Sequence, residues 1–200
     1  MTVNSITPGI YLERFDRKNA NMVLSWRNAP HVRANSLNDA EIALDDHIAF
    51  VDGLASRSDR HFFILHINGH PEAVFNINLD GTQGLWGCYI GGQTEPRPGL
   101  FPMLVGISGR LAFGTLGCTT LKSEVLSANK PPQKLNSFIG VNSNGTRVEK
   151  RPSGEKVEVL LYRVELAEWN DVRDQIDKVL TRGQRLMLSR FDTNPEASMM

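Results

Sequence analysis

The chain has 200 residues, of which 40% are hydrophobic and 22% are charged, which is typical of one soluble globular domain. Its 22 basic and 22 acidic residues balance, so no overall field attracts nucleic acid or an anionic membrane. No segment approaches the roughly 18 apolar residues of a membrane span, and residues 1–15 lack the pattern of a signal peptide. We therefore expect one cytoplasmic domain over 1–200, with its core over about 9–190, a frayed tail over 191–200, and no nucleic-acid or membrane partner.

The two cysteines, Cys88 and Cys118, lie within apolar segments and lack the spacing of metal ligands. This favours reduced, structural thiols in a cytosol and no metal site, and a disulfide between them is the alternative. His61, His66 and His70 also lack ligand spacing, so we expect them on strand and turn surfaces.

The first half of the chain predicts a strand, two helices and a hairpin. The strand spans 9–15, the first helix spans 16–28 and ends before Pro30, and the second helix runs from 38 or 39 to 55. Strands follow over 61–67 and 73–79, and the segment NGHP between them predicts a hairpin turn. These two strands should be antiparallel neighbours.

The second half begins with a strand over 85–91, the nonapeptide PRPGLFPML over 96–104, and an almost uncharged helix over 102–116. Such a helix should be covered on several sides. The strand over 119–126 that follows requires a right-handed parallel crossover. A short helix over 131–140, a hairpin of strands over 147–151 and 157–166, and an amphipathic helix over about 168–188 complete the domain.

Four stretches carry a resemblance to a known family. They are SWRN (25–28) with VR (32–33), DHIAF (46–50), WGCYIG (86–91) with PGL (98–100), and EVL (124–126) with Asn129. Together with the order of the elements, they resemble the GNAT acyltransferase superfamily over roughly residues 9–166. The branch they resemble acylates nucleotide-linked deoxyamino sugars and includes the acetyltransferase of pseudaminic acid synthesis.

The resemblance implies a mixed α/β (α+β) fold whose mostly antiparallel sheet is flanked by helices and splays between its fourth and fifth strands. The pantetheine arm of coenzyme A, supplied as an acyl thioester, would insert there and bind backbone groups of Tyr89 and Ile90. Asn129 would bind the same arm, or make only a local turn. Alternatively, the side chains of Trp86, Tyr89 and Ile90 are ordinary half-buried strand residues.

The turn before the helix at 102 departs from the family pattern. If Gly99 matches the first small residue of the coenzyme A diphosphate turn, Phe101 occupies the position of the second. The amides of Gly99, Leu100, Phe101 and Met103 would still favour an anion at a helix start. Phe101 must then turn away, the ligand must shift, or the turn binds nothing. Arg97 either adds charge to a phosphate or is a solvated loop residue.

Three residues are candidates for proton transfer during aminolysis of the thioester. Glu124 faces the cleft between the splayed strands and either accepts the amine proton or pairs with a neighbouring basic residue. His47 is a candidate because histidine side chains ionise near neutral pH and relatives often carry a histidine at this position. The alternative is a partly buried helical histidine without a role in proton transfer. Asn136 aligns with a tyrosine that protonates the leaving thiolate in many relatives, and an asparagine can only donate a hydrogen bond.

A group near the junction of the first two helices is assigned to the acceptor. Its members are Trp26, Arg27, Asn28, His31 and Arg33, with Trp86 from the fourth strand. Arginines suit a diphosphate, and a tryptophan suits a stacked base. Arg27 and Arg33 are favoured as ligand contacts, whereas the helical face shared with Met22 and Val23 favours a core position for Trp26.

These features predict an N-acyltransferase that transfers an acyl group from coenzyme A to a nucleotide-linked amino-dideoxy sugar in surface glycan synthesis, without a metal. Acetyl is the default donor group, and a longer group such as hydroxybutyryl is an alternative because Phe101 and Asn136 alter the donor site. The rival functions are a protein or peptide N-acetyltransferase and a degenerate, non-enzymatic binding domain. The sequence does not determine the oligomeric state, and a homo-oligomer is compatible with it.

Overall fold

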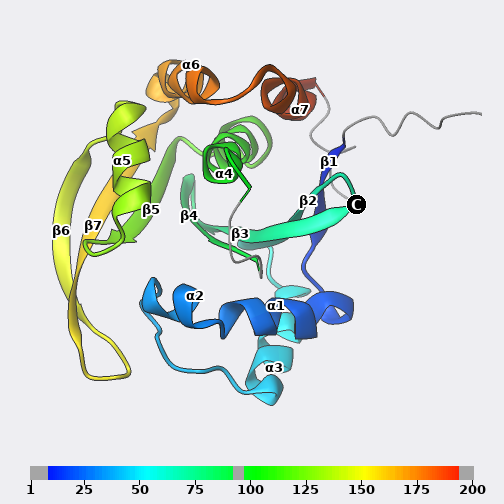
Figure 1. The fold of residues 1–200 in the computed structure, drawn as a ribbon, viewed down its shortest axis with the longest axis vertical. Coiled ribbons are helices and arrows are strands. Elements are labelled where there is room, and N and C mark those ends of the chain that lie inside the picture. The colour runs from blue at the N-terminus through cyan, green and yellow to red at the C-terminus, as the bar shows by residue number, and fades with distance from the viewer. Residues whose placement is uncertain (1–8, 92–96, 194–200) are drawn as a thin grey trace, which may run out of the picture.

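One mixed sheet organises the molecule. The computed structural model describes residues 9–91 and 97–193, so residues 1–8, Pro96 of the nonapeptide and residues 194–200 of the predicted tail lie outside the described residues. The sheet has seven strands in the order β1-β2-β3-β4-β5-β7-β6 (Figure 1). They are β1 (Ile10–Arg14), β2 (Arg60–Ile67), β3 (His70–Asp80), β4 (Gln83–Ile90), β5 (Thr120–Leu126), β6 (Ser143–Lys150) and β7 (Lys156–Glu165). Among these pairs only β4 and β5 run parallel, which confirms the predicted parallel pair and the fold class.

Helices cover both faces of the sheet, with α1, α2 and α3 on one face and α4, α6 and α7 on the other (Figure 1). The α-helices are α1 (Ala20–Arg27), α2 (Pro30–Ala34), α3 (Leu44–Leu54), α4 (Leu100–Gly109), α5 (Lys130–Phe138), α6 (Trp169–Val179) and α7 (Arg182–Thr193). Short 3₁₀ segments span Arg17–Asn19 and Leu166–Glu168, and a π-helical segment, Arg110–Thr115, continues α4.

Strand alternation divides the interior into two cores. On β3, Phe75 lies in the larger core beneath α4, whereas its neighbour Val74 lies in a smaller core with Trp26 of α1 and Val51 of α3. Successive side chains of a strand point to opposite faces, so one strand serves both cores. The predicted core position of Trp26 is confirmed.

Helix α4 is almost wholly buried, as its apolar sequence predicts, because it lies between the sheet and the two C-terminal helices. Small residues let these helices approach closely. A Cβ atom built on Gly109 would lie 2.2 Å from Cη2 of Trp169, and one on Gly106 would lie 2.9 Å from Leu188.

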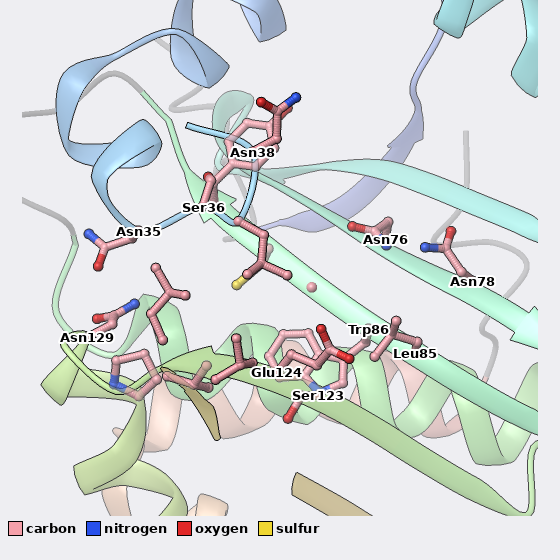
Figure 2. Close-up of a pocket in the computed structure, with 18 of the residues that line it drawn as sticks. Asn35, Ser36, Asn38, Asn76, Asn78, Leu85, Trp86, Ser123, Glu124 and Asn129 are labelled. Carbon is pink, nitrogen blue, oxygen red and sulfur yellow. The ribbon is translucent and has the colours of Figure 1, made fainter. Parts of the chain in front are cut away.

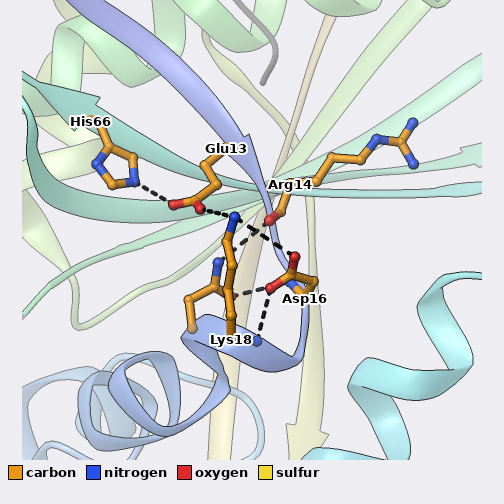
Figure 3. A network of polar contacts seen from close by, with 6 residues as sticks. Glu13, Arg14, Asp16, Lys18 and His66 are labelled. Atoms are coloured by element: carbon orange, nitrogen blue, oxygen red, sulfur yellow. Dashed lines mark hydrogen bonds and ion pairs between the residues drawn. The ribbon is translucent and has the colours of Figure 1, made fainter.

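A polar network fixes the edge strand β1 to its surroundings (Figure 3). The Glu13 carboxylate lies 2.7 Å from Nζ of Lys18 and 2.8 Å from Nε2 of His66. Burial alone raises the pKa of Glu13, but the hydrogen bonds from Lys18 and His66 outweigh it and lower the pKa overall. Asp16 caps the following 3₁₀ segment by accepting from the Lys18 amide. His66 is therefore buried and paired, not a surface residue as predicted.

The helix predicted from 38 or 39 begins only at Leu44. Both backbone groups of Ile42 bind the Asn28 side chain, each at 2.9 Å, which holds the preceding segment out of the helix. The sequence prediction also missed the short helix α2, in which Pro30 takes the first helical position that proline favours.

The single C-terminal helix predicted over 168–188 is instead two helices, α6 and α7. Leu180 is extended and buried at the break, and Thr181 and Gln184 form a reciprocal cap at the start of α7. Helix α7 continues to Thr193, so the prediction of fraying from 191 is wrong for its last turn. Phe191 is buried there, and Asp192 pairs with Arg110 at 2.8 Å.

We predict that Gly109→Ala lowers the free energy of unfolding by roughly 1–3 kcal/mol, because the added methyl group overpacks against Trp169. Thermal unfolding should show a decrease of about 2–4 °C per kcal/mol for a chain of this size. Gly114→Ala is the matched control, since a Cβ atom there meets no described atom within 4 Å. Equal melting temperatures for the two variants would show that the contact is not tight.

Candidate active site

The sheet opens between β4 and β5. The two strands pair only from Gln83 with Thr120 to Trp86 with Ser123. Beyond that point β4 still pairs with β3 as far as Ile90, and β5 still pairs with β7 as far as Leu126. Each strand therefore keeps one unpaired edge facing the other, which is the predicted splay.

Two adjoining cavities lie at this opening. The first, of about 430 Å³, is named the acceptor cavity after the predicted acceptor residue Arg27 in its wall, and it is lined by polar and apolar residues of the sheet and of the segment after α2 (Figure 2). The second, of about 820 Å³, is named the donor cavity after the predicted donor residue Gly99 in its wall, and it lies beside the start of α4. They share walls that include Cys88, Tyr89 and Asn129. A ligand lying in the opening can therefore contact both cavities.

The start of α4 offers fewer free amides than predicted. The Leu100 amide donates to the Arg97 carbonyl, and the Met103 amide donates to the Gly99 carbonyl, both at 3.0 Å. Among the described residues, the amides of Gly99 and Phe101 have no such partner. Gly99 has a φ of 78°, and Gln184 of α7 lies against it and donates to the Pro98 carbonyl at 2.7 Å.

Arg97 forms an ion pair that the sequence did not predict. Its Nη2 and Nε atoms lie 2.5 and 3.1 Å from Oε1 of Glu72, whose side chain is 1% exposed. The pair ties the start of α4 to β3 and supplies the charge that the buried carboxylate needs. Arg97 still lines the donor cavity.

Phe101 turns toward the sheet. Its ring stacks on Trp86, with centroids 6.3 Å apart and planes 28° apart. Because Trp86 is the last residue of β4 that pairs with β5, the stack lies at the closed end of the opening. The donor cavity beside Gly99 persists with Phe101 in its wall.

Glu124 lines the acceptor cavity but is already paired. Arg147 of β6 binds both of its oxygen atoms, at 2.6 and 2.7 Å, and also pairs with Glu149 at 2.8 Å. The hydrogen bonds that Arg147 donates to the two carboxylates raise its pKa, so it stays charged. The structural alternative for Glu124, a pair with a neighbouring basic residue, is thus present.

Asn136 and Asn129 lie on the opposite wall, on and before α5. Asn136 is buried, lines the acceptor cavity and hydrogen-bonds the Tyr162 side chain. Asn129 precedes the first residue of α5 and lines both cavities. Both amides can therefore be presented to a ligand in the opening.

His47 lies outside both cavities. It is buried between α1 and α3, where its Nε2 atom is 3.1 Å from the Ala20 carbonyl oxygen and its ring lies against Phe15. Burial lowers its pKa. The candidate role in proton transfer is not supported, and the alternative of a buried helical histidine is.

The residues assigned to the acceptor separate into two groups. Arg27 lines the acceptor cavity, with Nη2 donating to the Asn38 carbonyl at 2.6 Å and Nη1 buried without a partner among the described residues. His31 is exposed and lines the donor cavity. Asn28 and Arg33 lie outside both, because Asn28 holds Ile42 and Arg33 donates to the Asp39 carbonyl at 2.8 Å.

The sequence prediction missed a set of uncharged polar residues around the acceptor cavity. They are Asn35, Ser36, Asn38, Asn76 and Asn78 (Figure 2). Two of them carried a signal, since Asn76 and Asn78 alternate with apolar residues on β3 and so share one face. The Oδ1 atom of Asn78 is buried and has no hydrogen-bond partner among the described residues.

In the described part of the chain, no helix is long and apolar enough to cross a membrane, and no group of three or more acidic, histidine or cysteine side chains is placed to hold a metal.

No protein-family model matches the chain, and no curated protein matches it. Solved structures do. Spermidine N-acetyltransferase from Vibrio cholerae, in complex with CoA and spermine, has a TM-score of 0.72 at 12% identity over 80% of this chain and 98% of that one. AAC(6')-Ib in complex with ribostamycin and coenzyme A has a TM-score of 0.65 at 14% identity over 87% and 99%. An acetyltransferase of the GNAT family from Streptococcus pneumoniae has 0.61 at 16% over 78% and 98%. The fold is that of GNAT acetyltransferases.

We predict that His47 makes stability fall in acid. Its pKa is lowered in the folded chain, so unfolding takes up a proton as the pH falls below the ordinary value of 6.5. The stabilisation is complete above that pH and is lost as the pH falls toward the folded-state pKa. Melting temperatures from pH 7.5 to 5 should therefore decline more steeply for wild type than for His47→Gln. Parallel curves would contradict this assignment.

Cys88 should be chemically inert although it lies in the site. Burial raises its pKa to about 12, so roughly one molecule in ten thousand carries the thiolate at pH 8. Intact mass after incubation with iodoacetamide at pH 8 should show no alkylation of native protein and full alkylation in denaturant. An acyl adduct on Cys88 after incubation with acyl-CoA alone would contradict this prediction.

Proposed function

We propose that the protein is an acyl-CoA-dependent N-acyltransferase whose acceptor is the amine of a nucleotide-linked amino-dideoxy sugar. The observation that carries the proposal is the opening between β4 and β5, where unpaired strand edges meet two adjoining cavities. We infer a cytoplasmic enzyme of surface glycan synthesis that needs no metal.

The donor side fits the arm of a coenzyme A thioester. Unpaired main-chain groups of β4 beyond Trp86 can pair with the amides of pantetheine as a missing strand would. The diphosphate would meet the amides of Gly99 and Phe101. Neighbours of the same fold were solved with coenzyme A and with spermine or ribostamycin, which supports transfer to an amine. Acetyl is the default group, and hydroxybutyryl is the longer alternative.

The acceptor side favours a polyhydroxylated ring. Amide and hydroxyl side chains both donate and accept hydrogen bonds, so the polar set around Asn76 suits sugar hydroxyls. Two buried atoms in these walls, Oδ1 of Asn78 and Nη1 of Arg27, have no partner among the described residues and would be satisfied by a hydroxyl and by a phosphate oxygen.

Two contacts between the β6–β7 hairpin and the region around the end of α2 disfavour the rival peptide acceptor. The tip of the β6–β7 hairpin is fastened to the end of α2 and to the segment after it, because Arg151 donates to the Ala34 carbonyl at 2.8 Å and the Ser153 amide donates to Asp39 at 3.2 Å. An extended peptide would have to break these bonds to pass. A small acceptor would not.

Transfer needs no covalent enzyme intermediate. The neutral amine forms a bond to the thioester carbon, the carbon–sulfur bond breaks, and coenzyme A leaves as the thiolate. The amine proton leaves to water. Asn136 can hydrogen-bond the departing sulfur without protonating it.

The test is a coenzyme A release assay with acetyl-CoA and hydroxybutyryl-CoA. The acceptors are a uridine- or thymidine-diphosphate amino-dideoxy sugar and a ribosomal-protein peptide. We expect kcat/KM for the sugar to exceed that for the peptide at least tenfold. Asn78→Ala should lower the sugar value by about tenfold or more, because it removes a buried hydrogen-bond acceptor. Asn144→Ala, which changes an exposed asparagine outside both cavities, is the control.

A preference for the peptide would overturn the assigned acceptor. Thermal unfolding tests the donor, since acyl-CoA at 100 times its Kd should add about 2.7 kcal/mol of stability. No shift with any acyl-CoA would favour the non-enzymatic alternative.

A further inference from the structure

The charge of the acceptor cavity depends on a residue outside it. Among the described residues that line the two cavities, Glu124 is the only carboxylate, whereas Arg27 and Arg97 are both cationic. Arg97 is paired with Glu72. Whether the acceptor cavity attracts or repels a cation therefore depends mainly on whether another residue neutralises the negative charge of Glu124.

Arg147 neutralises the charge of the Glu124 carboxylate from a position outside both cavities. It lies on β6, two strands away from Glu124 on β5, and its guanidinium reaches across β7 to bind both oxygen atoms. A bidentate pair of this kind holds guanidinium and carboxylate together more firmly than a single contact. Arg147 does not line either cavity, so it removes negative charge from the wall without contacting a ligand there.

An acceptor with several ammonium groups needs carboxylates that are not already neutralised. Here Glu124 is neutralised and Arg27 adds positive charge. The binding of an amino sugar is little weakened by this arrangement. Its single amine reacts in the neutral form, and its hydroxyl groups can hydrogen-bond the asparagine side chains of the cavity.

We propose that Arg147 is a specificity-determining residue that excludes polycationic amines from the acceptor cavity by neutralising Glu124. This rests on the proposed function for the identity of the preferred acceptor, but the charge effect itself is a property of the cavity. A merely structural Arg147, which only fastens β6 to β5, would affect stability and not the choice of acceptor.

The experiment compares wild type with Arg147→Met, which keeps the aliphatic stem and removes the charge. Spermine binding is measured by calorimetry at low salt, and kcat/KM is measured for spermine and for the amino sugar. We expect Arg147→Met to bind spermine at least tenfold more tightly and to raise the spermine-to-sugar ratio of kcat/KM by a similar factor. Glu149→Gln is the matched control, because it removes the other partner of Arg147 and leaves the pair with Glu124.

The double variant Arg147→Met/Glu124→Gln should return spermine affinity to the wild-type level, since the uncovered carboxylate is then gone. Melting temperatures confirm that each variant is folded. Unchanged spermine affinity in folded Arg147→Met, or an equal gain in Glu149→Gln, overturns the inference. If wild type turns over no amino sugar but Arg147→Met gains spermine affinity, the proposed acceptor is wrong and the role of Arg147 stands.

Discussion

The separation of β4 from β5 after Trp86 is the constraint on which the site depends. Backbone groups that leave a ladder must find other partners, and here they face a cavity instead of a strand. The Trp86–Phe101 stack occupies the point of divergence, and Phe101 is held there by the largely buried helix α4 to which it belongs. The fold thus creates a slot that an extended ligand with amide groups can complete.

The arginines around the site bond other groups of the protein, although Nη1 of Arg27 has no partner among the described residues. Arg27 and Arg33 donate to carbonyl groups of the segment after α2, Arg151 donates to the last carbonyl of α2, and Arg97 and Arg147 pair with carboxylates. These contacts join the elements that surround the opening. They also leave recognition mainly to uncharged amides, which distinguish ligands by hydrogen-bond pattern more than by charge.

Local periodicity was enough to predict most of the fold. Alternation identified the strands, the Asn68-Gly69 turn fixed the first hairpin, and the strand, helix, strand order fixed the parallel pair. Long-range contacts decided the rest. The Asn28 side chain delays the start of α3 by binding Ile42, and no periodicity reveals this contact. The Thr181–Gln184 cap is different, because a threonine followed three residues later by a glutamine is a capping-box sequence. Likewise, His47 and Arg33 have suitable chemistry, but the Ala20 and Asp39 carbonyl groups that they contact could not be identified from local sequence.

The contact between Gln184 and Gly99 gives a structural reason for a glycine at this position. A side chain there would meet both a left-handed backbone and the amide of α7, whether or not any nucleotide ever binds. Relatives that keep α7 should retain this glycine even after losing catalysis. Its presence alone therefore reports the docking of a C-terminal helix, and only the neighbouring residues can diagnose a working donor site.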